Sequence, residues 1–480
     1  MSERRLAPAV EVASTFVDAL TGACADVVRD GDALLESARD WWPLGLRWKQ
    51  DGVVVAVPAA VARPSTAEEV AAVLRLCTEH RVPVTTAAGR SGVNGASVPV
   101  HGGVVLEMTG MAGIVTVDDD SLTVDVRAGM FGDEFENELR SGHGLTCGHW
   151  PQSMSLSTVG GWLACRGAGQ LSTRYGKVED IVTGLDVALA DGSVLCTGGA
   201  PRAAVGPDLT QLFVGSEGTL GVITSARLRV HPVPAGEWRG AWGFDSFDAG
   251  LDACRRILRR GATPAVLRLY DAIEGDRSYQ TGERAVLLVL DEADPLLVEA
   301  TASIVGEECA TTEALDVALV ERWLEHRNDV SALHDLTERG FVLDTMEVAA
   351  PWSALPRIYA RCLAALNAVE GMLVASAHQS HAYTDGACLY FTFVGQPAED
   401  AREQFYVEAW DAAQRAALAS GAALSHHHGV GLNRARFMRE AIGLGGLDVL
   451  QSVKDALDPA GVLNPGKLGL QSPFGEVHWP

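Results

Sequence analysis

Three consecutive histidines, His426, His427 and His428, form the densest group of chemically versatile side chains in this chain of 480 residues. Imidazole changes its charge near neutral pH, and it can either transfer protons or bind a metal ion. In an extended segment alternate residues share a face, so we expect His426 and His428 to point one way and His427 the other. A metal site would need further ligands at a workable geometry, which the tract alone does not supply.

Two glycine-rich stretches suggest a second kind of chemistry. They read "RSGVNGAS" (90–97) and "SEGTLGVIT" (216–224), and each follows a strand-like apolar run. Glycine lets the backbone come close to a ligand, and the free N–H groups of such loops can hold pyrophosphate oxygens. One such loop alone is often only a tight turn. Two of them, far apart in sequence, suggest a large dinucleotide between two lobes and point to a flavin enzyme.

Several other classes of protein find no support. No G-x-G-x-x-G opens a helix after the first strand, and neither a P-loop nor the H-E-x-x-H helix of a zinc hydrolase occurs. The formal net charge of −24 at pH 7 argues against nucleic acid and anionic membrane surfaces as partners. No apolar run reaches the length that spans a membrane. Glu11 and Asp18 interrupt what would be the apolar part of a signal peptide, so we expect a cytoplasmic protein.

The nine cysteines are scattered through the chain without C-x-x-C spacing. This usage fits reduced thiols in the core better than a disulfide framework or a zinc site. Trp41 and Trp42 lie in an aromatic segment near the N-terminus, where packing is a more frequent role than lining a substrate entrance.

The apolar periodicity predicts an α+β fold. Ser65 and Glu68 are expected to form a capping box for a helix whose apolar face carries Val70, Val73, Leu74 and Cys77. A strand at 82–86 then leads into the first glycine loop. Further strands are expected at 104–108, 114–117 and 122–126, and Asp191-Gly192 predicts a hairpin.

The second half of the chain alternates helices with strands. Pro232 and Pro234 mark the boundary expected before it. Helices are expected in "FDAGLDACRRILRRG" and "WSALPRIYARCLAALNA", and strands in "AVLLVLDE" and "ACLYFTFVG". Near the end, an amphipathic helix at 447–457 should stop at Asp458-Pro459.

Several segments together resemble one family. They are "RPSTAEEV", the first glycine loop, "GHWPQSMSLSTVGGWLACRGAGQLSTRYGKVEDIV", "GSEGTLGVIT" and "LDPAGVLNPGKL". They are similar to the flavoprotein superfamily of vanillyl-alcohol oxidase and p-cresol methylhydroxylase (PCMH). Within it, "STVGGWLACRGAGQLSTRYGKVED" and "SHHHGVG" are similar to alkyldihydroxyacetonephosphate synthase and to bacterial relatives known only as FAD-linked oxidases.

The resemblance implies a two-lobed PCMH-type FAD-binding domain, made of the N-terminal part and the C-terminal tail, with an inserted α+β cap domain. We expect a helical extension over 1–48, the FAD-binding domain over 49–233, the cap domain over 234–425 and the returning tail over 426–480. The family often forms dimers, so a homodimer is one expected state.

The resemblance also implies FAD as cofactor. The first loop contains no histidine, through which some members attach FAD covalently, so we expect non-covalent FAD. The loop also differs from the "GGGTS" form of the synthases. The residues carried over as cofactor-binding are, in the first loop, Arg90, Ser91, Gly92, Val93, Asn94 and Gly95; in the second strip, Pro151, Ser153, Ser157, Thr158, Gly160, Gly161, Thr173, Arg174 and Tyr175; and in the adenine-side strip, Glu217, Gly218, Thr219, Gly221 and Ile223.

On the substrate side, the resemblance places Tyr390 and the three histidines near the flavin, where a phenol and imidazoles can act as acid and base. Arg268 matches a substrate arginine of the synthases and would bind a carboxylate or phosphate. The alternative for Arg268 is an ion pair with Asp271 or Glu274.

Two further histidines belong to the predicted substrate site. His334 stands where the synthases have a second substrate arginine. His381 keeps the first position of a motif that holds a metal in the 2-hydroxyacid dehydrogenases of the superfamily. Tyr390 replaces the second histidine of that motif, and His427 replaces its glutamate. A phenol is a poor replacement for imidazole, so we expect no metal.

These observations predict an enzyme that uses FAD to act at flavin N5 on a small oxygenated, anionic substrate. In a synthase-like reaction, an acyl chain leaves and a fatty alcohol replaces it without net redox change. In the alternative, a metal-independent dehydrogenase or oxidase oxidises a 2-hydroxy acid or an alcohol. A catalytically silent flavin-binding protein is the remote alternative.

Overall fold

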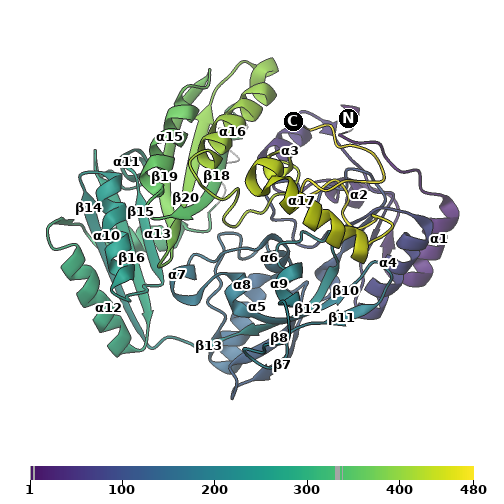
Figure 1. The fold of residues 1–480 in the computed structure, drawn as a ribbon, viewed down its shortest axis with the longest axis horizontal. Coiled ribbons are helices and arrows are strands. Elements are labelled where there is room, and N and C mark those ends of the chain that lie inside the picture. Colours follow the sequence, from purple (N-terminus) through teal and green to yellow (C-terminus); the bar gives the residue numbers. More distant parts are fainter. Residues whose placement is uncertain (1, 4–5, 330–335, 338, 480) are drawn as a thin grey trace.

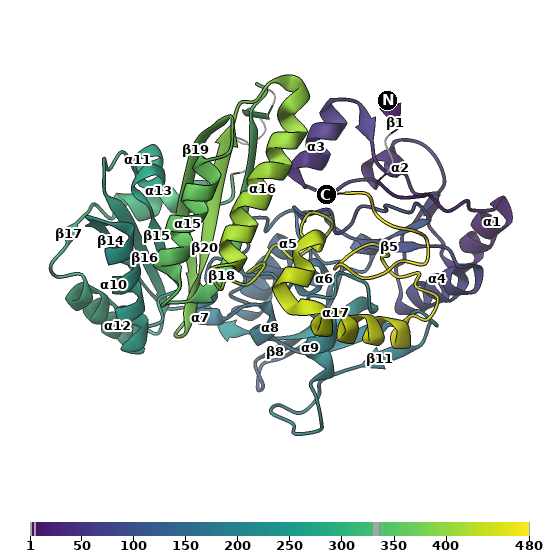
Figure 2. The ribbon, with the colours of Figure 1, turned by 45° about the horizontal axis from the view of Figure 1, so that its top comes forward.

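The structure is a computed structural model that describes residues 2–3, 6–329, 336–337 and 339–479. His334, one of the predicted substrate residues, lies outside the described residues. Figures 1 and 2 show two parts side by side: a large sheet with its helices in teal and green, and the N-terminal sheets in purple and blue. The yellow C-terminal segment lies over the N-terminal part.

The first sheet contains the predicted β-α-β unit. Its strand order is β2 (Val27–Val28), β4 (Ala60–Ala62), β6 (Val104–Glu107) and β5 (Val84–Ala87), with β4, β5 and β6 parallel. Helix α4 (Ala67–His80) connects β4 to β5. Its cap lies one residue later than predicted: Thr66 accepts from the N–H of Glu69 at 3.2 Å, and Glu69 accepts from the N–H of Ser65 at 2.7 Å. The neighbouring Ser-Thr and Glu-Glu pairs offer two registers, and the structure adopts the second.

The second sheet is antiparallel, in the order β11 (Val194–Cys196), β10 (Val182–Ala188), β12 (Val222–Arg229), β8 (Thr123–Arg127) and β7 (Ile114–Asp118). The hairpin predicted at Asp191-Gly192 joins β10 to β11, and Gly192 has a φ of +80°. The helices near this sheet are α5 (Gly132–Glu138), α6 (Val159–Cys165), α7 (Ser172–Tyr175), α8 (Val178–Ile181) and α9 (Leu209–Phe213).

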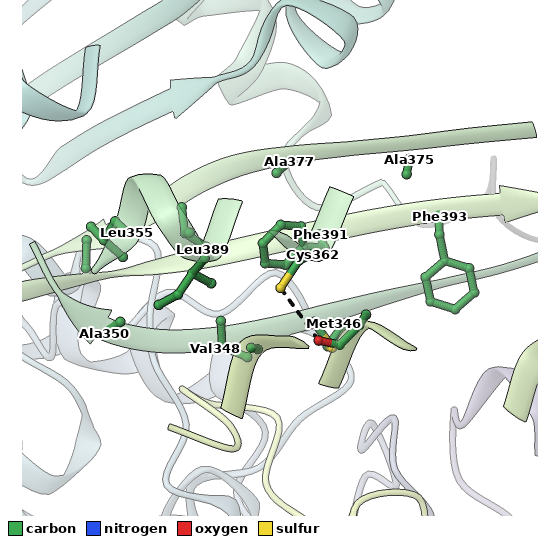
Figure 3. Packing of buried hydrophobic residues seen from close by; sticks show 14 of the residues in the cluster. Met346, Val348, Ala350, Leu355, Cys362, Ala375, Ala377, Leu389, Phe391 and Phe393 are labelled. Atoms are coloured by element: carbon green, nitrogen blue, oxygen red, sulfur yellow. Dashed lines mark hydrogen bonds between the residues drawn. The ribbon is translucent and has the colours of Figure 1, made fainter. Parts of the chain in front are cut away.

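The third sheet has seven antiparallel strands, in the order β17 (Glu313–Ala314), β14 (Gly236–Phe244), β16 (Ala285–Ala293), β15 (Val266–Tyr270), β19 (Met372–Ala382), β20 (Gly386–Gly395) and β18 (Val342–Pro351). Helices α10 (Phe247–Arg259), α12 (Pro295–Glu308), α15 (Leu355–Asn367) and α16 (Arg402–Leu418) contribute to the core on one face. Figure 3 shows Met346, Val348, Leu389 and Phe391 in this core. Cys362 of α15 donates to the carbonyl of Ala413 there at 3.6 Å.

The alternation of side chains along these strands leaves a second face free of those helices. Because Val348 and Leu389 point into the core, Glu347 and Tyr390 point to the opposite face. Helix α7 contacts β15 and β19. Helix α13 (Ala318–His326) packs against the same apolar cluster as Tyr270, through Val320 and Trp323. This second face therefore turns toward the N-terminal part of the molecule.

The C-terminal tail returns to the N-terminal part. Helix α17 (Met438–Leu457) ends before Asp458, as predicted. Lys454 donates to the carbonyl of Thr219 at 2.8 Å, and Asn464 donates to the carbonyls of Glu217 at 2.7 Å and Ala96 at 3.0 Å. The tail thus ties the two glycine-rich stretches together. This arrangement agrees with the α+β fold class expected, whereas the exact domain boundaries remain predictions.

The N-terminal segment contains α1 (Ser14–Ala23), α2 (Asp32–Glu36) and α3 (Pro43–Gln50). Trp42 is fully buried and donates to the hydroxyl of Tyr406 at 2.9 Å, so it has the packing role that we expected. Within the described residues, no helix combines the length and apolar character needed to cross a membrane.

Candidate active site

A row of four side chains crosses the free face of the seven-stranded sheet. Tyr270 of β15 pairs with His378 of β19, His378 pairs with Tyr390 of β20, and Tyr390 pairs with Glu347 of β18. Directly paired residues of antiparallel strands lie on the same face. The ring centroids are 5.3 Å apart for Tyr270 and His378, and 4.8 Å apart for His378 and Tyr390. Cross-strand register thus assembles residues from four separate segments.

A β-bulge adds His381 to this face. The register of β19 against β20 shifts between Gln379 and His381. Without the shift, residues three apart such as His378 and His381 would point to opposite faces. With it, His381 pairs with Cys388, which lies two residues from Tyr390. The ring of His381 therefore faces the same side as the row.

The histidine tract is fixed by a single carboxylate. The backbone N–H groups of His426, His427 and His428 all donate to Glu347, the latter two at 3.3 and 2.9 Å. The hydroxyl of Ser425 donates to the same carboxylate at 2.8 Å. Glu347 was not predicted, because an acidic residue in a mostly apolar strand gives no signal of its partners.

This wrapping shows that the alternating arrangement predicted for the three histidines is wrong. The ring of His427 lies 5.1 Å from that of His426 and 4.4 Å from that of His428. The tract bends around a carboxylate instead of running extended, so its rings converge.

Glu347 is held as an anion. Its carboxylate is fully buried and pairs with the equally buried Arg434 at 2.8 Å. Burial alone would raise its pKa, but Arg434, His428 and His426 hold the pKa of Glu347 at about 2. The carboxylate of Glu347, which holds the histidine tract, is therefore ionised at any ordinary pH.

A chain of exchangeable protons runs through the site. Ser172 bonds to Nδ1 of His381 at 2.7 Å and to the hydroxyl of Tyr383 at 3.2 Å. That hydroxyl bonds to Nε2 of His426 at 3.0 Å, and Nδ1 of His426 bonds to Nδ1 of His427 at 2.9 Å. Each link joins two groups that can both give and accept a proton. Ser172 and Tyr383 were not among the predicted residues.

Burial keeps the imidazoles neutral. It lowers the pKa of His381, His426 and His427 well below the usual value, and it lowers the pKa of His428 to about 4. Burial raises the pKa of the Tyr390 phenol, which bonds to the hydroxyl of Thr345 at 3.0 Å. Near neutral pH the cluster thus combines a protonated phenol, which can donate a proton, with neutral imidazoles, which can accept one.

The same histidines have a geometry that could hold a metal ion. Ring nitrogens of His381, His426 and His427 lie within 4.8 Å of one another, and so do ligand atoms of Glu347, Cys388 and His427. The absence of a metal from the working enzyme therefore remains a prediction.

Arg268 lies beside the row without a carboxylate partner. Its Nε donates to the hydroxyl of Tyr270 at 2.6 Å, and its Nη2 donates to Nε2 of His378 at 2.6 Å. No described carboxylate lies within ion-pair distance of Arg268, so the alternative pairing with Asp271 or Glu274 does not form. A half-buried guanidinium without a counter-ion is suited to binding an anion.

The first glycine loop contacts the histidine tract. Asn94 donates to the carbonyls of His428 at 3.1 Å and Gly429 at 3.3 Å. Arg90 donates to Ser37 at 3.0 Å and forms an ion pair with Glu107. Ser91 and Val93 complete this loop with Gly92 and Gly95, and Gly95 has a φ of +79°. The predicted cofactor loop and the predicted acid–base residues are therefore neighbours.

The second predicted strip divides between two roles. Thr158 caps α6 by accepting from the N–H of Gly161 at 3.3 Å, and Ser157 accepts from Trp162 at 2.7 Å. A Cβ on Gly160 would lie 2.7 Å from Ala128, so this glycine serves close packing. Pro151 and Ser153 form the turn before α6, where their carbonyls accept backbone N–H groups.

Three residues of this strip contact the seven-stranded sheet. Thr173 accepts from the N–H of Ala382 at 3.3 Å, Arg174 pairs with the buried Asp291 at 2.5 Å, and the hydroxyl of Tyr175 donates to Glu292 at 2.8 Å. They join the two parts of the molecule, and their contact with a cofactor stays a prediction.

The adenine-side strip holds the tail. Glu217 accepts from the N–H groups of Val430 at 2.6 Å and Gly431 at 2.9 Å. Thr219 donates to the carbonyl of Ser216 at 2.7 Å. Gly218 has a φ of +73°. A Cβ on Gly221 would meet Val187 at 2.5 Å, and Ile223 is buried in the core, so these two serve packing.

The residues around the predicted strips fit a dinucleotide. Asn94 Oδ1 in the first loop, Thr86 Oγ1 beside Gly218 and both ring nitrogens of His149 before the second strip are buried and have no partner among the described residues. Buried polar atoms are normally satisfied, so these orphaned atoms fit a polar ligand. The backbone of Gly92 is also open, since a Cβ there would meet only Asp40 at 3.6 Å.

Two sequence profiles match the chain. The FAD binding domain matches residues 58–198, and the C-terminal domain of FAD linked oxidases matches residues 234–468. The chain belongs to the family of FAD-linked oxidases that these two profiles describe. FAD is its cofactor, and the family is one of FAD-linked oxidoreductases.

The relatives include enzymes of both expected kinds. The chain is 28% identical over 432 residues to the uncharacterized FAD-linked oxidoreductase YgcU of Escherichia coli (strain K12), with 86% of this chain and 89% of the relative covered. It is 28% identical over 528 residues to alkyldihydroxyacetonephosphate synthase of Trypanosoma brucei brucei, with 99% and 84% covered. It is 29% identical over 432 residues to glycolate oxidase subunit GlcD of Bacillus subtilis (strain 168), with 86% and 89% covered.

Solved structures share the fold. A structure of alkyldihydroxyacetonephosphate synthase superposes with a TM-score of 0.80 at 24% identity, covering 95% of this chain and 86% of that one. A structure of p-cresol methylhydroxylase with substrate bound gives a TM-score of 0.76 at 16% identity, covering 97% and 99%. These structures confirm the predicted fold.

Proposed function

We propose that this protein is an alkyldihydroxyacetonephosphate synthase-like FAD-linked oxidase that acts at flavin N5 on a small, oxygenated, anionic substrate. The observation that carries this proposal is the convergence on one sheet face of Tyr390, the histidine tract and the carboxylate-free Arg268. Few structural roles explain a half-buried phenol, neutral imidazoles and a guanidinium without a carboxylate partner in one place.

The cofactor would be held non-covalently by the first loop around Gly92 and Asn94 and by the second strip around Thr158 and Gly161. Thr86, next to Gly218, would supply a further polar contact. When bound, FAD supplies an electrophilic ring that can accept electrons or a carbon nucleophile at N5. The absence of histidine from the first loop supports non-covalent binding.

Arg268 would bind the anionic group of the substrate. Its planar guanidinium matches carboxylate or phosphate geometry, and its partial burial strengthens the attraction because less water competes. Tyr270 and His378 hold two of its nitrogens, so the group would be positioned before the substrate arrives.

Tyr390 and the histidine tract would carry the proton transfers. The raised pKa of Tyr390 keeps its hydroxyl protonated, so it serves as an acid toward an oxygen of the substrate. Because its pKa is lowered, the imidazole ring of His427 stays neutral and is free to accept a proton from a C–H or O–H acid. The chain through His426 and Tyr383 would then carry that proton away from the reacting atoms.

The second candidate is a metal-independent dehydrogenase or oxidase of a 2-hydroxy acid or an alcohol. It is favoured by the relation to glycolate oxidase subunit GlcD, whose identity to this chain is close to that of the synthase. The same site serves both reactions, since either one needs an anion anchor and a proton acceptor beside flavin N5. A homodimer and a cytoplasmic location remain predictions from the sequence.

Anaerobic absorbance titration of the purified yellow protein tests these alternatives. The panel would contain 2-hydroxy acids, alcohols and acyl-dihydroxyacetone phosphate. Lasting bleaching by a 2-hydroxy acid or alcohol identifies a dehydrogenase or oxidase. Bleaching only by the acyl ketone phosphate, reversed by a fatty alcohol, identifies the synthase reaction. A tightly bound flavin that no member of the panel alters would instead support the catalytically silent protein, and metal analysis of the active sample tests metal independence.

A further inference from the structure

We infer that His378, held by Glu274, is a positioning residue that orients the guanidinium of Arg268 toward the anionic group of the substrate. This inference rests on the proposed function, because it assigns the residues that prepare the anion site. It adds His378 of β19, which neither the sequence nor the family relation singled out. It also gives Glu274 of helix α11 (Ala272–Tyr279), considered above only as a direct ion-pair partner of Arg268, a role that acts through His378.

The hydrogen bonds fix the protonation of His378. Arginine can only donate, so Nε2 of His378 must accept from Nη2 of Arg268 across their 2.6 Å contact. In a neutral imidazole the other nitrogen then carries the hydrogen. Nδ1 of His378 therefore donates to Glu274, whose oxygen lies 3.1 Å away. The order Glu274, His378, Arg268 leaves no freedom to exchange donors and acceptors.

The ring of His378 is also held in its plane. It lies between Tyr270 and Tyr390, at centroid distances of 5.3 and 4.8 Å, and is nearly parallel to Tyr390 with an interplanar angle of 20°. A ring packed on both sides cannot rotate without displacing its neighbours. The direction of its Nε2 lone pair, and hence the place of the guanidinium, is thereby set.

Glu274 is anchored at the start of α11. Its backbone N–H donates to Asp271 at 2.8 Å, and the other oxygen of Asp271 accepts from the N–H of Ala377, next to His378, at 2.7 Å. The helix start and the strand are thus tied together on both sides of the Glu274–His378 contact. A mobile carboxylate could not hold the histidine in this way.

The hydrogen bonds from Glu274 through His378 to Arg268 form a relay that orients the guanidinium of Arg268 without neutralising its charge. Elsewhere on this sheet Arg174 meets a carboxylate directly, 2.5 Å from Asp291, and that ion pair has a structural role. Arg268 instead meets the carboxylate of Glu274 only through a neutral imidazole. Among the described residues, Nη1 of Arg268 has no hydrogen-bond partner. A charge that is oriented but unpaired remains available to a ligand.

The test measures the binding of two anions, oxalate and inorganic phosphate, to the FAD-loaded protein from the change in the flavin absorption spectrum. His378→Leu removes the acceptor for Arg268, whereas His378→Gln keeps an acceptor oxygen near the position of Nε2. Ser376→Ala is the matched control, because Ser376 is buried two residues away on the same strand and its hydroxyl has no partner among the described residues.

We expect at least one anion to bind the unaltered protein, and His378→Leu to weaken that binding by about tenfold, as losing a hydrogen bond to a charged group should. His378→Gln should recover most of the affinity, and Ser376→Ala should match the unaltered protein. Unchanged affinity in His378→Leu would overturn this inference alone. Failure of the unaltered protein to bind either anion would overturn the anionic substrate as well.

An NMR measurement complements this, because it reads the protonation of His378 in the unaltered protein and uses a variant only to assign the signal. With ¹⁵N-labelled histidine in the FAD-loaded protein, the ring of His378, identified by its absence in His378→Gln, should show a protonated Nδ1 and an unprotonated Nε2 near neutral pH. A proton on Nε2 would contradict the relay, because Arg268 could then not donate to it.

Discussion

Glu217 and Glu347 both accept hydrogen bonds from backbone N–H groups of the segment 425–431, yet the two carboxyl groups differ in their own charge state. Glu217, from the second glycine-rich stretch, takes the N–H groups of Val430 and Gly431. Glu347, from the seven-stranded sheet, takes those of the three histidines. One short segment is thus clamped by a carboxylate from each of the two parts of the molecule.

The difference between the two lies in the nearest cation. Both are buried, which raises a carboxyl pKa. Arg434 touches Glu347 and holds the pKa of Glu347 at about 2. Burial raises the pKa of Glu217 to about 7, because two backbone N–H groups and the more distant Lys467 and Arg434 compensate only in part. The histidine side of the segment is therefore permanently anchored, whereas the cofactor side responds to pH.

The largest expected effect is that of Glu347→Ala. It would leave Arg434 buried without its partner and free three backbone N–H groups, which should destabilise the protein by about 3–5 kcal/mol. The thermal unfolding midpoint and the rate of flavin reduction would both fall. Ser425→Ala, which removes one hydrogen bond to the same carboxylate, should cost only about 1 kcal/mol. Equal stability of Glu347→Ala and the unaltered protein would contradict the clamp.

Tyr390→Phe should keep bound FAD and lose turnover by about 10²–10⁴-fold, because the proton donor is removed while the ring still stacks on His378. Substrate-dependent bleaching of the flavin in a rapid-mixing experiment measures this. Full activity in Tyr390→Phe would show that the phenol is neither acid nor base. Tyr383→Phe, which interrupts the chain one step further out, should have a smaller effect.

Gly218→Val should lower FAD occupancy. The φ of Gly218 is +73°, where a β-branched residue is strained by roughly 1–2 kcal/mol, and the new side chain would obstruct the close backbone approach expected there. The ratio of flavin to protein absorbance in the purified sample measures the occupancy. A Gly218→Val protein that is as yellow and as stable as the original would refute the predicted position of the cofactor.

The last predicted effect, a pH dependence from Glu217, is confined to part of the pH range. Its folded pKa of about 7 lies above the ordinary value of 4.5, so the folded state binds the proton more tightly than the unfolded state. The stability contributed is present below the unfolded pKa and is lost as pH rises through the folded pKa. Glu217→Gln should remove this loss, with a gain of at most about 3 kcal/mol at pH 8 and little change at pH 5.

Thermal unfolding midpoints of both proteins across that pH range test the prediction for Glu217. A midpoint difference that does not change with pH would mean that Glu217 keeps one charge state throughout. Glu347 provides the contrast, since its lowered pKa places its own transition between its ordinary value of 4.5 and about 2.

The elements that the sequence predicted best are those with local signals. The hairpin at Asp191-Gly192 and the end of α17 at Asp458 both depend on neighbouring residues, and both are confirmed. The capping box was wrong by one residue, because Ser65-Thr66 is followed by Glu68-Glu69 and either register satisfies the local pattern. Local chemistry locates an element better than it fixes its first residue.

The candidate site was predictable only in part, for a related reason. Tyr390 and the histidine tract carry a family signature, so the sequence pointed to them. Glu347 and His378 contribute through cross-strand register, which the linear sequence does not display. Tyr383 lies in the turn after β19 and contributes through a contact with His426, 43 residues further along the chain. The bulge between Gln379 and His381 is marked by no glycine or proline, yet it alone brings His381 to the face of His378.

The most direct test of the account is a crystal structure of the protein with FAD and oxalate bound. The account predicts that the reactive ring of the flavin faces the row of Tyr270, His378 and Tyr390, with the oxalate against Arg268 and between the ring and the histidine tract. An isoalloxazine ring that lies away from this row, with Tyr390 and His427 out of reach of its N5 side, would contradict the assignment of the active site.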